Sequence, residues 1–166
     1  SAGLDIAPAL NPMGSPVAVN RASGVTRAIV APAESSNIFA GQGAVVDLGD
    51  DMDMVTQAKA LQFISFGEAG SAKAGGSRAA TFLLFREQLL AARNYARNPA
   101  TLAEWSNGAM IQRADAEALV AVINGQTPLF VRVDRAADIL NVLKLRTEFP
   151  ALKLVLVGAT EGWLVA

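Results

Sequence analysis

The most regular hydrophobic pattern lies in the last third of the chain. Residues 128–133 form an apolar run with one arginine, residues 136–148 have helical periodicity, and residues 152–157 are nearly all apolar. Strand, helix and strand at this spacing predict a βαβ unit. A strand as apolar as 154–157 is typical of a parallel sheet that helices cover. The predicted inner residues of the helix are Ile139, Leu140, Val142 and Leu143.

Weaker patterns continue the alternation of strands and helices. Residues 78–98 place Phe82, Phe85 and Leu89 on one side of an amphipathic helix, and Asp115 precedes a helix over 116–123 that stops at Asn124-Gly125. The other predictions are loops at 4–20 (with one short helix) and 33–43, strands at 25–31 and 61–67, an edge strand or hairpin arm at 44–48, short helices at 52–60 and from 161 onward, a linker at 68–77 and an irregular stretch at 105–108.

This alternation predicts an α/β fold in which parallel strands alternate with helices, as in part of a (β/α)8 TIM-type barrel. A three-layer doubly wound sheet is the alternative, because pattern alone does not separate the two. We expect the 166 residues to be a single segment of a larger domain, since the first residue is Ser1 and the last predicted helix has no cap.

The composition favours some classes of binding partner and argues against others. The chain is 52% hydrophobic and 17% charged, with a mean hydropathy of +0.32, which is more apolar than an average globular chain. We therefore expect a homo-oligomer or association with the missing half of a barrel. The net charge of −1 without a basic stripe argues against nucleic acid, and no apolar run is long enough for a membrane span. The absence of cysteine leaves the compartment open.

The sequence excludes several kinds of site. It contains no His or Cys, so it holds neither a Ser-His-Asp triad nor a thiolate or imidazole metal site. Gly41-Gln42-Gly43 and Gly75-Gly76 lack the strand and helix context of a nucleotide loop. An acidic cluster lacks the spacing of a calcium loop, and we interpret it as a solvated turn: Asp47, Asp50, Asp51 and Asp53.

Three residues form a sharper candidate for substrate binding: Arg132, Asp134 and Glu161. Each stands where a predicted parallel strand ends, so all three are expected at one edge of the sheet, where α/β enzymes place their sites. The simpler interpretation is that Asp134 caps the following helix, Glu161 favours the first turn of its own helix, and Arg135 and Asp138 are surface charges. Arg132 would need an anionic partner if it pointed inward.

Six short phrases occur in a characteristic order along the chain. They are Asn-Pro at 11–12, Asn-Arg-Ala-Ser-Gly-Val-Thr at 20–26, Ala-Gly-Gln-Gly-Ala at 40–44, Asp-Arg-Ala-Ala-Asp-Ile at 134–139, Glu-Phe-Pro at 148–150 and Val-Gly-Ala-Thr-Glu-Gly at 157–162. In this order and spacing they resemble the middle of imidazolonepropionase-like amidohydrolases. The resemblance implies a (β/α)8 barrel that hydrolyses C–N bonds, such as non-peptide or cyclic amides, with a metal-activated water.

The resemblance also implies metal-binding histidines at the ends of the fifth and sixth strands. The corresponding positions here are Arg132 or its neighbour and Gly158, and neither residue can replace an imidazole. We expect no cofactor in this chain, and a divalent metal would need ligands from the full-length protein. The leading hypothesis is a fragment, inactive alone, of an amidohydrolase-like hydrolase. The alternative is a metal-free binding or scaffold protein of the same fold that recognises an anionic small molecule through Arg132.

Overall fold

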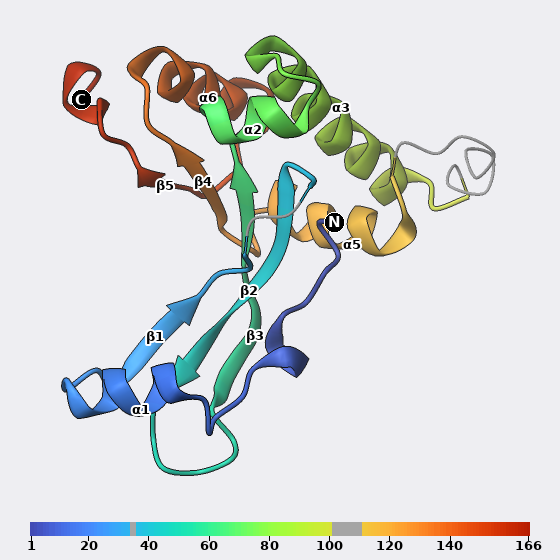
Figure 1. Cartoon of the computed structure of the whole chain (residues 1–166). Helices are drawn as coiled ribbons and strands as arrows, with labels where there is room; N and C mark the ends of the chain where they lie inside the picture. Colours follow the sequence, from blue (N-terminus) through green and yellow to red (C-terminus); the bar gives the residue numbers. More distant parts are fainter. Residues whose placement is uncertain (34–35, 101–110) are drawn as a thin grey trace.

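The computed structural model describes residues 1–33, 36–100 and 111–166, and in these residues five strands form one sheet (Figure 1). The predicted irregular stretch at 105–108 lies outside this range. The spatial order follows the sequence order: β1 (Arg27–Val30), β2 (Phe39–Asp47), β3 (Val55–Ser65), β4 (Leu129–Val133) and β5 (Leu154–Gly158). The helices are η1 (Ala7–Ala9), α1 (Ser15–Ala22), α2 (Gly67–Lys73), α3 (Arg78–Arg97), α5 (Arg113–Ile123), α6 (Ala136–Glu148) and η2 (Gly162–Leu164).

The sheet is mixed. β3, β4 and β5 are parallel, with Phe63 beside Phe130 and Phe130 beside Val155. β1, β2 and β3 are antiparallel, so the prediction of parallel strands is wrong for that part. The reason is the short connection between β2 and β3, which is long enough for a hairpin and too short for a crossover helix. The run at 44–48 is therefore a hairpin arm, and β2 is an interior strand of the sheet.

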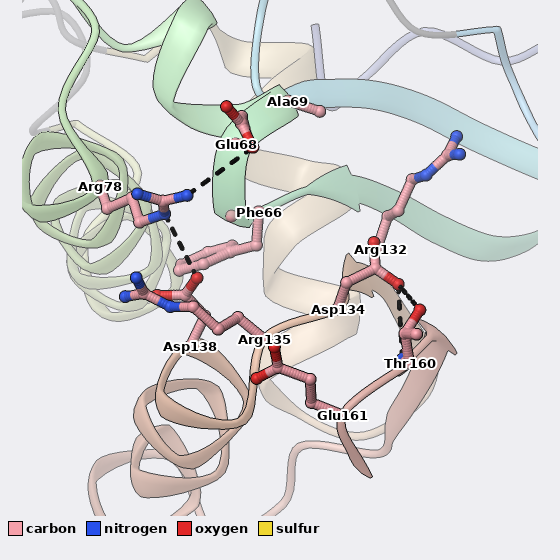
Figure 2. Close-up of a pocket in the computed structure, with 11 residues that line it drawn as sticks. Phe66, Glu68, Ala69, Arg78, Arg132, Asp134, Arg135, Asp138, Thr160 and Glu161 are labelled. Atoms are coloured by element: carbon pink, nitrogen blue, oxygen red, sulfur yellow. Dashed lines mark hydrogen bonds and ion pairs between the residues drawn. The ribbon is translucent and has the colours of Figure 1, made fainter.

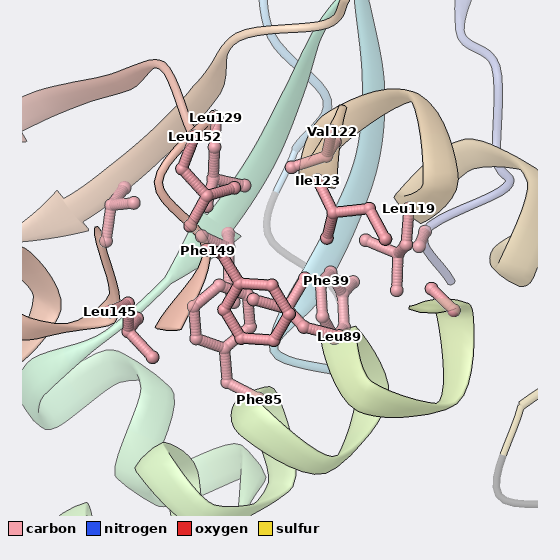
Figure 3. Packing of buried hydrophobic residues seen from close by; sticks show 14 of the residues in the cluster. Phe39, Phe85, Leu89, Leu119, Val122, Ile123, Leu129, Leu145, Phe149 and Leu152 are labelled. Carbon is pink, nitrogen blue, oxygen red and sulfur yellow. The ribbon is translucent and has the colours of Figure 1, made fainter. Parts of the chain in front are cut away.

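The helices α3, α5 and α6 cover one face of the sheet. Phe85 and Leu89 of α3 are buried in one cluster with Leu119 of α5 and Leu145 of α6 (Figure 3). The strands supply the other side of this cluster with alternate residues, Ile64, Leu129, Val131 and Val133. Parallel neighbours joined in sequence order by right-handed crossovers place their helices on the same face. The described part is therefore a curled sheet covered on one side, as in part of a barrel, and it lacks the reversal of strand order of a doubly wound sheet.

The opposite face of the sheet carries a second, smaller apolar cluster. Leu61 and Phe63 of β3 are buried there with Ala40 of β2, and Phe130 of β4 and Val157 of β5 pack against them while remaining half-buried. We call this set the inner face. It follows from strand alternation, because these residues lie between those that face the helices.

Four sequence predictions are wrong in ways that tertiary contacts explain. The predicted helix at 52–60 is mostly strand, since residues 55–65 pair with β2. The predicted loop at 33–43 ends early, because β2 begins at Phe39. The glycine at 43 allows β1 to approach β2 closely, since a Cβ there would lie 2.5 Å from the carbonyl oxygen of Val30. The linker at 68–77 contains α2, whose Gly70 allows close packing on Ser65. Within α6 the buried residues are Asp138, Ile139, Val142 and Leu145, so Leu140 and Leu143 were wrongly placed inside.

The remaining predictions agree with the structure apart from their ends. The helix predicted over 78–98 is α3, the helix over 136–148 is α6, and the strands at 25–31, 61–67, 128–133 and 152–157 correspond to β1, the end of β3, β4 and β5. The helix predicted after Asp115 starts earlier, at Arg113, and the one predicted from 161 is the 3-10 turn η2. Among the described helices, none is both long and apolar enough to cross a bilayer.

Candidate functional site

A pocket of about 580 Å³ lies at the carboxyl ends of the three parallel strands (Figure 2). Its volume falls within the usual range for small-molecule sites. The segments that follow β3, β4 and β5 contribute most of the lining, Arg132 comes from β4 itself, and Arg78 comes from the start of α3. The lining residues are Phe66, Gly67, Glu68, Ala69, Arg78, Arg132, Asp134, Arg135, Asp138, Thr160 and Glu161.

Asp134 and Glu161 hold together the loops that follow β4 and β5. Thr160 donates to Asp134 Oδ1 from its Oγ1 at 2.7 Å and from its backbone nitrogen at 3.4 Å. In return, the backbone nitrogen of Ala136 donates to Glu161 Oε2 at 2.8 Å. The Thr160 hydroxyl bond, the Thr160 backbone bond and the charge of Arg132 lower the pKa of Asp134. These contacts fix one wall of the pocket.

Asp138 forms a second, separate group with two arginines. Arg135 donates to Asp138 Oδ1 at 3.4 Å, and Arg78 Nε lies 3.4 Å from Oδ2 as an ion pair. Arg78 also approaches the exposed Glu68, with 3.9 Å between the nearest atoms. The Asp138 side chain is only 8% exposed, and its Oδ2 receives no hydrogen bond from any described residue. A buried carboxylate oxygen in this state is unusual.

Arg132 lies on the other side of the pocket. Val131 and Val133 on either side of it are buried towards the helices, so strand alternation exposes Arg132 on the opposite face, above the inner face. Its neighbours across the strands are Ser65 of β3 and Val157 of β5. In Figure 2 its guanidinium extends away from Arg78 and Asp138. The pocket therefore has a cationic end and, at a distance from it, a carboxylate held between arginines.

Comparison with known proteins identifies the fold. No protein-family model matches the chain, and no curated protein matches it. A solved structure, an amidohydrolase from Thermotoga maritima MSB8, superimposes with a TM-score of 0.81 at 22% sequence identity. The match covers 99% of this chain and 45% of that chain. The chain therefore has the fold of part of that structure. It spans less than half the length of the structure that it resembles.

Within this fold, the structure brings the three predicted site residues together. Arg132, Asp134 and Glu161 line one pocket, which confirms that they share an edge of the sheet. The simpler interpretation was wrong in detail. Asp134 does not cap α6, whose N-cap is Arg135 without a side-chain bond, and it is Glu161 that bonds the first turn of α6.

Asp138 was missed by the sequence reasoning, which took it for a surface charge. Helical spacing carried the signal, because Asp138 precedes Val142 by four positions and Leu145 by seven and so shares their buried face. Arg78 and Glu68 were missed for another reason. They follow β3, and no local pattern links that segment to the loops after β4 and β5.

The other candidates from the sequence do not form sites in the described structure. Gly41 and Gly43 lie within β2, and Gly75 and Gly76 lie at positive φ between α2 and α3. Asp47 Oδ1 accepts from the Gly49 backbone in the turn that was predicted. No described group of three or more His, Cys, Asp or Glu side chains could hold a metal ion.

The metal expected for an amidohydrolase does not fit the described residues. β4 carries Arg132, which has no lone pair to offer, and β5 ends at Gly158. Gly158 has φ +86°, and a Cβ there would lie 2.6 Å from Asp134 Oδ1. The end of β5 therefore carries no side chain that could bind a metal, and a histidine in its place would adopt an unfavourable φ and displace the Asp134 carboxylate.

Proposed function

We propose that this chain is the central segment of an amidohydrolase-like hydrolase that cleaves C–N bonds in non-peptide or cyclic amides as part of the intact protein. The observation that carries the proposal is a polar pocket at the carboxyl ends of parallel strands in an amidohydrolase fold. The sequence phrases at 20–26, 134–139 and 157–162 favour the imidazolonepropionase-like branch.

The inner face supports a complete (β/α)8 barrel in the intact protein. Barrel strands alternate between residues facing the helices and residues filling the interior, and Leu61, Phe63 and Phe130 occupy the interior positions here. The Thermotoga structure extends well beyond the matched region. The occupant that we propose for the inner face is therefore the remaining strands of the same barrel, with a homo-oligomer as the alternative partner.

The role that we assign to this segment is substrate binding. Arg132 is the candidate for holding an anionic group of the substrate, since guanidinium pairs well with carboxylates. Asp134 and Glu161 keep the loops beside it in place through Thr160 and Ala136. In the hydrolysis, water adds its hydroxyl to the acyl carbon, the C–N bond breaks, and the nitrogen takes up the remaining proton.

A metal-free binding or scaffold function is the second candidate. The resemblance implies metal-binding histidines at the ends of two strands, and the residues at these positions are Arg132 and Gly158. Neither side chain can bind a metal, and this favours a function without one. In that case the pocket would recognise an anionic small molecule and release it unchanged.

The deciding experiment is an assay of the intact protein. A panel of cyclic and open-chain amides with and without a carboxylate is incubated with it, and NMR follows the ring-opened amino acid from the cyclic amides and the separate amine and acid from the open-chain ones. The hydrolase is supported if a carboxylate-bearing amide is turned over and its turnover falls at least about tenfold in Arg132→Gln. Arg97→Gln, at the end of α3, is the control and should leave turnover unchanged. Saturable binding without turnover supports the second candidate, and neither binding nor turnover contradicts both.

A further inference from the structure

The helix α2 forms one side of the pocket, and few contacts hold it there. Its first turn carries the lining residues Glu68 and Ala69, which in Figure 2 lie across the pocket from Thr160. Only its two glycines, Gly67 and Gly70, are buried, and its apolar side chains are all alanines. A helix of seven residues is marginal without tertiary packing, and this one buries almost no apolar surface. Its position therefore depends on a few specific contacts.

Two of these contacts attach α2 to the end of β3. Gly70 packs so closely on Ser65 that a Cβ at position 70 would overlap the Ser65 carbonyl oxygen. Lys73, at the other end of the helix, donates from Nζ to Ser65 Oγ at 3.2 Å. A third contact is the ion pair of Glu68 with Arg78, whose nearest atoms are 3.9 Å apart, and the Glu68 side chain is 94% exposed. Exposed pairs of this kind stabilise little, so the two contacts with Ser65 hold the helix in place.

The chain can change direction at both ends of α2. Gly67 begins the helix with φ +63°, and Gly75 and Gly76 follow it with φ +70° and +81°. Apart from the chain neighbours, no described atom lies within 4 Å of a Cβ at Gly75 or Gly76. Because glycine adopts positive and negative φ about equally readily, neither packing nor backbone sterics fix the turn at 75–76. The segment between Gly67 and this turn can therefore move as a unit.

We propose that α2 is a lid on the pocket. It opens as one unit about Gly67 and the turn at Gly75-Gly76, and the hydrogen bond from Lys73 to Ser65 holds it closed. Lids are drawn from the parts of a structure with the lowest local stability, and α2 fits that description because it buries no large side chain. In the open state the pocket is reachable from the side of β3. The inference concerns the pocket of the proposed function, and it does not require that hydrolysis takes place there.

A buried thiol beneath the lid tests the inference in the intact protein. Thr81 of α3 is fully buried, and its Cγ2 lies 3.0 Å from the Cβ position of Gly70, so α2 covers it. Ala92 is equally buried and lies about 16 Å further along the same helix. Thr81→Cys and Ala92→Cys are labelled separately with a methanethiosulfonate reagent without substrate, and peptide mapping gives the rate at each position. We expect labelling at least about tenfold faster at position 81, and equal rates overturn the inference.

A variant of Lys73 separates opening of the lid from fraying of α3. In the Thr81→Cys background, Lys73→Met should speed labelling at least about threefold, because a hydrogen bond that holds the lid closed is gone. Lys144→Met is the matched control, since it removes a lysine hydrogen bond within α6, to Asn141 Oδ1 at 3.3 Å, and should leave the rate unchanged. Fraying at the start of α3 would also expose position 81, but it would not respond to Lys73→Met. An unchanged rate in that variant therefore contradicts the inference.

Gly70→Ala tests the packing contact of the lid. The added Cβ overlaps the Ser65 carbonyl oxygen, so the closed state becomes less favourable and labelling at position 81 should rise at least about tenfold. Labelling at position 92 should not change, because the main cluster keeps its contacts. A parallel rise at both positions would mean that the variant unfolds the chain as a whole, which contradicts a lid. If Thr81→Cys fails to fold, Ser65→Cys, which is also fully buried against α2, replaces it as the reporter.

The labelling and the amide assay can fail independently. Turnover of an amide together with equal labelling at positions 81 and 92 leaves the hydrolase standing and refutes the lid. Faster labelling at position 81 without turnover of any amide in the panel leaves the lid standing and refutes the hydrolase.

Discussion

Asp134 and Gly158 fit together at the ends of two neighbouring strands. Asp134 Oδ1 occupies the space where a side chain at position 158 would begin, 2.6 Å from the ideal Cβ position. Gly158 also has φ +86°, a conformation that other residues adopt at a cost. The two residues meet beside the pocket, at the strand end where the resemblance implies a metal ligand.

Replacement of Gly158 by alanine should destabilise the chain for two separable reasons. The positive φ alone costs about 1 kcal/mol, and the contact with Asp134 adds to that. Gly24→Ala is the matched control, because Gly24 has φ +89° with nothing within 4 Å of its Cβ position. Urea unfolding should show a larger loss at 158 than at 24. In an Asp134→Ala background the two losses should become similar, and an unchanged difference would contradict the proposed contact.

Thr160→Val should reduce stability in a pH-dependent way. The Thr160 hydroxyl is the largest cause of the lowered pKa of Asp134, so its bond stabilises the fold above the unfolded-state pKa of about 4. The stabilisation disappears as the pH falls through the lowered pKa of the folded state. We expect a loss of up to about 1 kcal/mol at pH 7 that shrinks towards pH 2. Thr160→Ser, which keeps the hydroxyl, should behave like the wild type, and a pH-independent loss would refute the linkage.

Glu148 joins α6 to α3 through Arg86. Arg86 donates to both carboxylate oxygens of Glu148, from Nε at 2.7 Å and from Nη2 at 3.0 Å. We expect Glu148→Gln to lower the free energy of unfolding in urea, since two bonds from one guanidinium to a carboxylate stabilise more than an ordinary surface pair. Glu87→Gln removes a looser partner of the same arginine, at 3.6 Å, and should lower the free energy of unfolding by clearly less. Equal losses would show that the bidentate geometry adds nothing.

Leu89→Ala should be far more damaging than Leu83→Ala on the same helix. Leu89 is fully buried in the main cluster, whereas Leu83 is 58% exposed. Truncation at 89 removes buried methyl groups and leaves a cavity, which costs about 2–5 kcal/mol. Leu83→Ala should stay within about 0.5 kcal/mol. Thermal unfolding of the two variants measures the difference, and similar midpoints would mean that α3 packs through another face.

We also predict that the 166-residue chain binds no zinc stoichiometrically. It contains no histidine or cysteine, and its described carboxylates form no group of three. Gly158→His should not create a site, because one imidazole beside Asp134 falls short of the three protein ligands that zinc needs. Elemental analysis after dialysis checks both statements. One tightly held zinc per chain in the wild type or the variant would overturn them.

The sequence by itself determined the local elements and the general location of the pocket. Apolar runs and helical periods predicted β4, α6 and β5. Because parallel strands end at one edge of a sheet, the sequence also placed Arg132, Asp134 and Glu161 at the same edge, where they line one pocket. Each strand and helix depends on residues that are close in the chain, so the hydrophobic pattern of a short segment is enough to predict it.

Only the tertiary structure decided the features that depend on distant residues. The strand at 55–65 forms because β2 pairs with it, against the local preference of an Ala, Gln and Lys stretch for helix. Arg78 reaches Asp138 because α3 and α6 cover the same face of the sheet, although 60 positions separate them. Gly158 is enclosed by Asp134, a residue 24 positions earlier. The spacing of residues in the sequence does not predict such contacts, since they form only when the strands pair in the folded sheet.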